Sequence, residues 1–149
     1  MPDSIEIRID NKQVQEALLK VAAKAETLRP LMKNIAGIMA DATEENFAKE
    51  GRPDKWQELA ESTIKKRKKA GHWPGQILQV EGQLAASITT AYDNESAVIG
   101  SNLDYAAIHQ LGGQAGKNRS VSIPARPYLN LTDGEFDDIL DATEKFLQF

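Results

Sequence analysis

Five consecutive basic residues form the densest run of charge in the chain: Lys65, Lys66, Arg67, Lys68 and Lys69. They belong to 18 lysines and arginines, which are outnumbered by 22 aspartates and glutamates. On a helix, a turn of about 100° per residue points such a run to every side, so we expect the turn to be exposed all round. The run is either a solvated helix face or a contact for DNA phosphates or an acidic neighbouring protein.

The side chains most often used in catalysis do not form a recognisable set. His72 and His109 lie far apart, and neither has a second histidine four residues away that would complete a metal-binding pair. His109 lies beside the apolar face of a short predicted helix, so a packed or hydrogen-bonded histidine is expected there. The carboxylates are scattered over helix faces, and no serine lies in a nucleophile-elbow sequence.

Nucleotide and thiol chemistry are also not predicted. Gly116-Lys117 resembles part of a phosphate-binding loop, but Leu111 replaces the required glycine and Asn118 the magnesium-binding serine or threonine. The chain has no cysteine, which excludes disulfides, thiolate catalysis and cysteine-bound zinc. We therefore expect no catalytic residues, no metal and no cofactor.

Two other residues have sequence surroundings that favour contacts with a partner. Arg126 lies in Pro124-Ala125-Arg126-Pro127, where the prolines restrict the backbone. It is interpreted either as a structural salt bridge or carbonyl clamp, or as a subunit contact, for which arginine is favoured. Trp73, among the glycines and proline of residues 71–75, is either a loop anchor on the core or an interface residue.

A short helix and a polar loop precede that arginine. Ser101-Asn102 can cap the helix, and Gly112-Gly113 stops it because glycine takes positive φ without steric cost. The loop at residues 114–122 carries Lys117 and Arg119, and we expect it to be mobile in an isolated subunit and to order on docking. The apolar positions of the helix are Leu103, Tyr105, Ile108 and Leu111.

The N-terminal third of the sequence is predicted to form elements that contribute to the hydrophobic core. Alternating Ile5, Ile7 and Ile9 predict a strand, and from Lys12 the apolar period becomes that of a helix. Pro30 interrupts this pattern, which indicates two helices or one kinked helix. Core packing explains the apolar stripe, with a subunit contact as the alternative. Its members are Val14, Ala17, Leu18, Val21, Ala22, Ala25, Leu28, Leu31, Met32, Ile35, Met39 and Ala42.

The middle of the chain predicts short elements. Trp56 and Leu59 begin a segment in which Ser62 or Thr63 could cap the helix of the basic run. Residues 82–87 suit a short helix with Leu84 facing inward. Residues 88–92 and 97–99 then alternate on either side of a polar turn, which predicts a β-hairpin.

The C-terminal third predicts a strand followed by a helix. Residues 126–131 have apolar Tyr128, Leu129 and Leu131 and are interpreted as a strand. Thr132-x-x-Glu135 is a capping box that opens an amphipathic helix. The predicted fold class is α+β, with a small, mainly antiparallel sheet packed against the long N-terminal helices and the C-terminal helix.

Length and composition limit the classes of protein to which the chain can belong. The 149 residues suffice for one core, so residues 1–149 are predicted to be a single domain. Hydrophobic residues make up 41% and charged residues 27%, as in ordinary globular proteins, and the net charge of −4 gives no general case for nucleic-acid binding. No apolar stretch is long enough to span a membrane, and no basic start with an apolar run indicates a secretory signal.

Two separated boxes resemble the phage virion morphogenesis family, whose members complete the tail or join head to tail in contractile-tailed phages. The first box is Tyr105, Ala106, Ile108, His109, Gly112 and Gly113. The second box is Pro124, Ala125, Arg126 and Pro127. Upstream positions that fit the same pattern are Trp56, Leu59, Thr63, Lys66, Leu78, Gly82, Leu84, Ser87 and Ile88. The resemblance covers roughly residues 56–131.

The resemblance implies a structural protein of the neck or tail-terminator region that works by docking. It implies a cyclic homo-oligomer, with six subunits matching tail symmetry, around DNA passing through a channel. Expected partners are other neck and tail proteins such as the connector and tail tube, with no membrane partner. Expected locations are the host cytoplasm during assembly and the mature virion. The expected interface residues are Tyr105, His109, Lys117, Arg119, Arg126 and Trp73.

Two alternatives to this structural role remain open. The first is a small nucleic-acid-binding domain that uses residues 65–69, which predicts steeply salt-dependent DNA binding. The second is a metal-free hydrolase, which would need two or more acids in one cleft with raised pKa values.

Overall fold

The computed structural model describes residues 11–78 and 83–146, and the predicted strand at Ile5–Ile9 lies outside them. The long elements are α1 (Lys12–Ala22), α2 (Arg29–Ala48), α3 (Glu61–Ala70) and α6 (Asp133–Phe146). The short helices are α4 (Gln83–Ala86), α5 (Ala106–Leu111) and the 3₁₀ turn η1 (Lys117–Arg119). The strands are β1 (Thr89–Tyr92), β2 (Ala97–Gly100), β3 (Gly113–Ala115) and β4 (Val121–Ile123).

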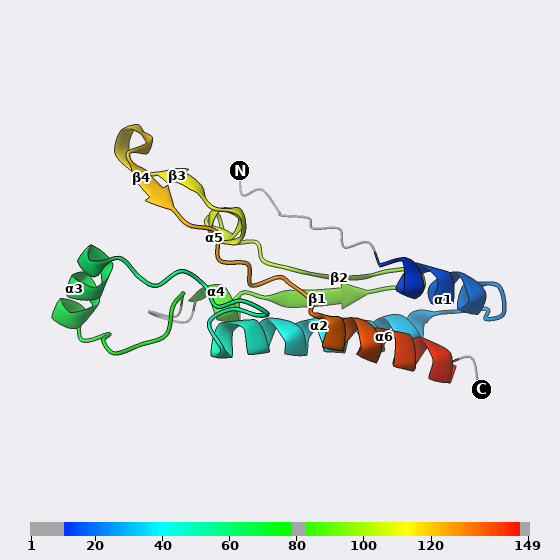
Figure 1. Ribbon diagram of the computed structural model, residues 1–149. Helices are drawn as coiled ribbons and strands as arrows, with labels where there is room; N and C mark the ends of the chain where they lie inside the picture. Colours follow the sequence, from blue (N-terminus) through cyan, green and yellow to red (C-terminus); the bar gives the residue numbers. More distant parts are fainter. Residues whose placement is uncertain (1–10, 79–82, 147–149) are drawn as a thin grey trace.

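The body of the molecule is a hairpin packed on helices. β1 and β2 pair antiparallel, with Thr90 opposite Ile99, and both strands pack on α2. α6 lies beside α2 and also contacts α1 (Figure 1). This arrangement confirms the predicted α+β class and the predicted hairpin. The sheet, however, divides into two separate two-stranded ribbons among the described residues.

The ends of α1 and α2 follow from local sequence. The Asn11 side chain accepts a hydrogen bond from the Val14 N–H at 3.0 Å and so caps α1. Pro30 lies in the first turn of α2, where its missing N–H costs nothing. Of the two alternatives for this region, two separate helices is therefore the correct one.

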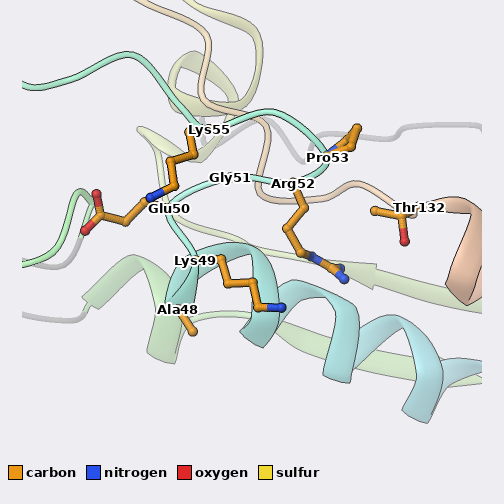
Figure 2. Close-up of a pocket in the computed structure, with 8 residues that line it drawn as sticks. All are labelled: Ala48, Lys49, Glu50, Gly51, Arg52, Pro53, Lys55 and Thr132. Carbon is orange, nitrogen blue, oxygen red and sulfur yellow. The ribbon is translucent and has the colours of Figure 1, made fainter.

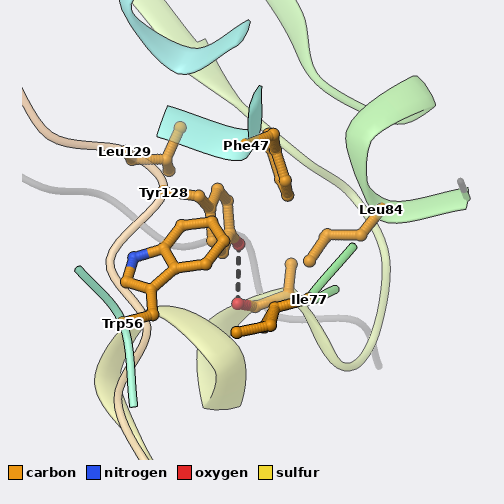
Figure 3. Packing of buried hydrophobic residues seen from close by; sticks show 7 residues of the cluster. Phe47, Trp56, Ile77, Leu84, Tyr128 and Leu129 are labelled. Carbon is orange, nitrogen blue, oxygen red and sulfur yellow. Dashed lines mark hydrogen bonds between the residues drawn. The ribbon is translucent and has the colours of Figure 1, made fainter. Parts of the chain in front are cut away.

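Two apolar clusters form the core. One lies where α1, α2 and α6 meet and contains Val21, Leu31, Met32, Ile35 and Ile139. The other lies beyond the C-terminal end of α2, where Phe47 stacks on Tyr128 at 5.4 Å and meets Trp56 edge-on at 5.8 Å (Figure 3). Leu84 of α4 belongs to this second cluster and faces inward as predicted.

The predicted strand at residues 126–131 is wrong. The segment pairs with no neighbouring strand, and side chains satisfy the backbone of its central residues. The Gln110 amide oxygen accepts from the Tyr128 and Leu129 N–H groups at 3.0 and 2.9 Å. The Asn46 amide nitrogen donates to the Tyr128 and Asn130 carbonyls at 2.7 and 3.0 Å. Two buried amides thus take the place of a paired strand.

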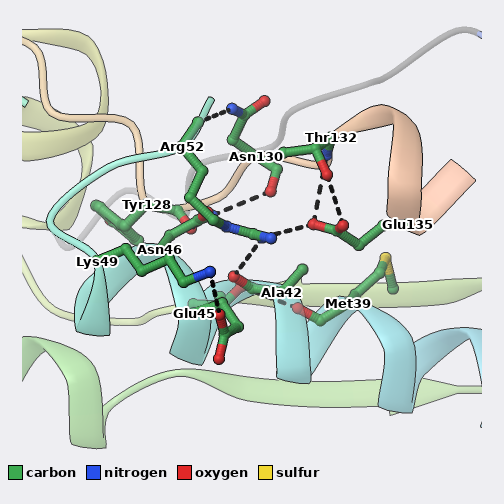
Figure 4. A network of polar contacts seen from close by, with 11 residues as sticks. Met39, Ala42, Glu45, Asn46, Lys49, Arg52, Tyr128, Asn130, Thr132 and Glu135 are labelled. Atoms are coloured by element: carbon green, nitrogen blue, oxygen red, sulfur yellow. Dashed lines mark hydrogen bonds and ion pairs between the residues drawn. The ribbon is translucent and has the colours of Figure 1, made fainter. Parts of the chain in front are cut away.

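A polar network ties this segment to α2 and α6 (Figure 4). Arg52 forms an ion pair with Glu135, and its Nε donates to the Asn46 side-chain oxygen at 2.8 Å. At the start of α6 the Glu135 carboxylate accepts from both the Thr132 N–H and the Thr132 hydroxyl, so one of the two bonds of the predicted capping box forms. Burial alone would raise the pKa of Glu135, but hydrogen bonds from Thr132 and Arg52 outweigh it and lower that pKa.

Two elements project from the body as an arm, composed of α3 and the β3–η1–β4 ribbon (Figure 1). β3 pairs antiparallel with β4, so the loop predicted at residues 114–122 is instead a hairpin with η1 at its tip. α3 follows Ala60 without a side-chain cap, so the predicted capping by Ser62 or Thr63 is wrong. Within residues 11–78 and 83–146, no helix combines the length and apolar character needed to cross a membrane.

Candidate assembly interface

A groove of about 490 Å³ lies where α3, the extended segment 57–60, α5 and β4 meet. It brings together residues that are far apart in the sequence, and we call it the arm groove. Its lining includes Arg67, Tyr105, His109, Val121, Ile123 and Arg126. Three of the six predicted interface residues and one member of the basic run therefore share one surface.

Arg126 clamps the segment that forms one wall of the arm groove. Its Nε donates to the Gln57 carbonyl at 3.0 Å, and its Nη2 donates to the Glu58 carbonyl at 3.1 Å. Its own N–H donates to the His109 carbonyl at 2.8 Å, which fixes the arginine against α5. Only 7% of Arg126 is exposed. Of the two structural roles considered for it, the carbonyl clamp is the one observed, and no carboxylate among the described residues forms an ion pair with it.

Arg67 is the buried member of the basic run. It is 6% exposed, which corrects the expectation that this turn is exposed on every side. Its Nη1 donates to the Gln76 carbonyl at 2.8 Å, so the returning chain after α3 covers this side of the helix. Its Nε is buried without a hydrogen-bond partner. The other four cations of the run are exposed, as expected for solvated lysines.

The two arginines act on each other electrostatically. Burial, and then the positive charge of Arg67, lower the pKa of Arg126. Burial also lowers the pKa of Arg67, while the carboxylate of Glu50 acts in the opposite direction. The Glu50 carboxylate lies beyond ion-pair distance of the Arg67 guanidinium. Among the described residues, both guanidiniums donate only to neutral carbonyls. Buried charges in proteins are ordinarily paired, and neither arginine forms an ion pair within the described residues.

His109 lines the arm groove beside Arg126. Burial, and then the charge of Arg126, lower its pKa, so the neutral imidazole is favoured. Its Nδ1 is buried without a hydrogen-bond partner. The ring meets Tyr105 edge-on at 5.8 Å, and the Tyr105 hydroxyl donates to the Gln83 side chain at 3.2 Å. The packed histidine expected from sequence is therefore also a groove-lining residue.

The remaining predicted interface residues lie outside the arm groove. Lys117 and Arg119 are exposed in η1 at the tip of the ribbon. Trp73 is half-buried in the turn after α3. Sequence reasoning missed Val121, which is 49% exposed on β4, because the ribbon was interpreted as a polar loop. Leu111 was assigned to the apolar face of this helix, but it is the last residue of α5 and is 65% exposed.

A second hollow, of about 600 Å³, lies beyond the end of α2 (Figure 2). Its lining includes Lys49 and Arg52, which already pair with Glu45 and Glu135. Arg52 therefore belongs to the polar network that joins α2 to α6. In the described part of the chain, no three His, Cys, Asp or Glu side chains are placed to hold a metal ion.

An α+β body with a projecting arm, exposed cations on that arm, and two groove arginines that form no ion pair in the described part of the chain fit a structural protein that contacts other proteins. The comparisons with known proteins agree with this class. The phage virion morphogenesis family model matches residues 9–148. The chain belongs to this family.

Curated relatives cover almost the whole chain. "Mu-like prophage FluMu G protein 2" of Haemophilus influenzae is 43% identical over 145 residues, spanning 97% of this chain and 96% of the relative. "Putative capsid assembly protein G" of Escherichia phage Mu is 35% identical, spanning 93% and 91%. "Mu-like prophage FluMu G protein 1" of Haemophilus influenzae is 34% identical, spanning 85% and 84%. No solved structure matches the chain. Family membership supports a structural role in phage virion assembly.

Proposed function

We propose that this protein is a docking subunit in phage tail completion or head–tail joining, forming a ring around the DNA channel. Its partners are other copies of itself, six in the closed ring, and neighbouring neck and tail proteins such as the connector and tail tube. It acts in the host cytoplasm during assembly and stays in the neck or tail of the mature virion. Membership of the virion morphogenesis family supports the assembly role.

The observation that carries the proposal is the charge state of the arm groove. Arg67 and Arg126 are both more than nine-tenths buried, and their hydrogen bonds go to neutral carbonyls. Desolvating a guanidinium is costly unless an anion compensates it. A docking partner that brings a carboxylate would supply this compensation.

The test is electron microscopy of particles made without this gene. Filled heads beside unattached tails, or tails of uncontrolled length, are expected, and the two defects separate joining from tail termination. The relative from phage Mu carries the name of a capsid assembly protein. Absent or malformed heads beside normal tails would therefore move the role to the capsid, and intact infectious virions would refute an assembly role.

A nucleic-acid-binding role is the second candidate, because Lys65, Lys66, Lys68 and Lys69 are exposed on a projecting helix. It predicts that the isolated protein binds duplex DNA with a steep salt dependence. Replacing the four lysines by glutamine would then abolish binding. Fluorescence anisotropy over a salt series measures it, with replacement of the exposed Lys12, Lys20, Lys24 and Lys33 as the matched control.

A further inference from the structure

The arm carries cations that no ion pair neutralises within the described residues. The arm groove holds two buried guanidiniums, and the exposed face of α3 beside it carries four lysines. None of these six cations forms an ion pair in the described part of the chain. The Nε of Arg67 is buried and has no hydrogen-bond partner, and the whole residue is 6% exposed.

A matching negative surface lies on α6. Acidic residues recur on one face of this helix at spacings of four, four and three, which we call the acidic stripe. Its members are Asp133, Asp137, Asp141 and Glu144. All four are exposed, and among them only Asp141 has an ion-pair partner, Lys145, in the described residues.

The stripe and α3 also match in length. At 1.5 Å per residue the stripe spans about 17 Å and the ten residues of α3 about 15 Å. They lie at opposite ends of the elongated subunit, because α6 packs on α1 and α2 while α3 projects with the arm (Figure 1). The two surfaces therefore cannot meet within one copy.

We infer that the arm of one copy, through α3 and the arm groove, docks on the acidic stripe of α6 in the next copy. The carboxylates of the stripe neutralise the α3 lysines and supply an anion to Arg67 and Arg126, which form no ion pair within the described residues. Because the two surfaces differ, the contact is heterologous and closes into a ring when its rotation fits. The inference rests on the proposed function and names the contact that would build its ring.

Cysteine cross-linking tests the contact directly, because the chain has no cysteine of its own. Ser62, exposed on α3 at the groove, is changed to Cys in one protein and Asp137 to Cys in another. The matched control replaces the second protein by Glu16→Cys, an exposed acid on α1. Under mild oxidation, the Ser62→Cys and Asp137→Cys pair is expected to form heterodimers. Heterodimer yields no higher than those of the control pair would overturn the inference.

Charge reversal gives a second, independent measurement by analytical ultracentrifugation of the full chain. Lys65→Glu with Lys69→Glu, or Asp137→Lys with Glu144→Lys, each raises the apparent dissociation constant at least about tenfold. Combining the two reversed pairs, either in one chain or by mixing, restores association. Glu16→Lys with Glu26→Lys is the control and leaves association unchanged.

The outcomes separate this inference from the proposed function. A wild-type protein that remains monomeric, or reversed pairs that fail to rescue each other, overturns the arm-to-stripe contact. Loss of DNA binding in the Lys65→Glu and Lys69→Glu protein, with no change in self-association, also overturns it and favours the nucleic-acid role. Electron microscopy of particles made without the gene tests the assembly role independently of which contact builds the ring.

Discussion

The side chains of Asn46 and Gln110 bond the backbone of residues 128–130 in place of a neighbouring strand. This arrangement predicts how much stability the substitution Gln110→Met removes. Methionine keeps the approximate volume of the buried glutamine but can neither accept nor donate the bonds that hold residues 128 and 129. Two N–H groups and one carbonyl lose their partners, because the Gln110 amide also donates to the Leu129 carbonyl at 3.2 Å. An unsatisfied buried group costs about 1–3 kcal/mol, so three groups give a sum of about 3–9 kcal/mol.

Relaxation that admits water lowers this cost, so we expect the free energy of unfolding to fall by about 3 kcal/mol or more. For a chain of this length that corresponds to a melting temperature lower by about 6–12 °C. Urea unfolding followed by circular dichroism measures the free energy from the midpoint and slope. Hydrogen exchange at the Tyr128 and Leu129 amides should accelerate more than exchange in α1, which Gln110 does not touch.

The control is Gln13→Met, the same substitution at an exposed position of α1. It is expected to change the free energy of unfolding by less than about 0.5 kcal/mol. A Gln110→Met protein that folds and loses less than about 1 kcal/mol would refute the view that this amide replaces a strand. Unchanged exchange at residues 128 and 129 would refute it as well.

Other predictions follow from single sites. Gly112→Ala should destabilise by about 1–3 kcal/mol, since φ is +76° and an added Cβ would lie 2.8 Å from the Ala125 nitrogen. Gly37→Ala, in the middle of α2 with nothing within 4 Å, should stabilise by about 0.5–1 kcal/mol, and urea unfolding measures both. Because Glu135 has a lowered pKa, its stabilisation is present above the unfolded value of 4.5 and is lost as pH falls through the folded value. Thermal unfolding of Glu135→Gln should therefore depend less on pH in the acid range than that of the wild type. The pKa of His109 is below 6.5 in the folded protein, so the unfolded state binds the proton first as pH falls. The stability of the wild type should therefore decrease as pH drops below 6.5. His109→Gln should not show this decrease in the same thermal unfolding assay.

The parts of the fold that the sequence predicted are those whose signals are local. The β1–β2 hairpin has alternating strands and a turn in which Asp93 accepts from the Glu95 and Ser96 N–H groups, both at 2.7 Å. The start of α6 is likewise determined by the Thr132 and Glu135 pair. In both cases the residues that fix the element are within a few positions of it, so one sequence suffices.

Two of the errors come from long-range partners, and a third has a different cause. Residues 126–131 have the composition of a strand, but their partners Asn46 and Gln110 come from two different helices. The β3–β4 ribbon was missed for a different reason, because strands of only three residues are too short to show an alternating period. Arg67 looked like its exposed neighbours, since nothing in a run of charge reveals the Gln76 carbonyl that covers it.

The candidate site was predicted in part. The two boxes that carry the family resemblance contain Tyr105, His109 and Arg126, which the fold brings to one groove. Upstream positions of the same resemblance, such as Trp56 and Leu84, are core residues. Trp56 also donates to the Pro127 carbonyl at 2.9 Å and so holds the second box in place. A sequence pattern alone does not separate residues that build the groove from residues that line it.

The same limit applies within single side chains of the groove. Arg126 shapes the wall by clamping the Gln57 and Glu58 carbonyls, and it also provides the positive charge that a partner would meet. A substitution to alanine removes both functions, so its effect on assembly would not distinguish them. Arg126→Gln keeps a donor for one carbonyl and removes the charge. If the charge of Arg126 contributes to docking, the Arg126→Gln protein should remain folded but associate more weakly than the wild type. If the arginine is purely structural, association should fall only as far as the folded fraction falls.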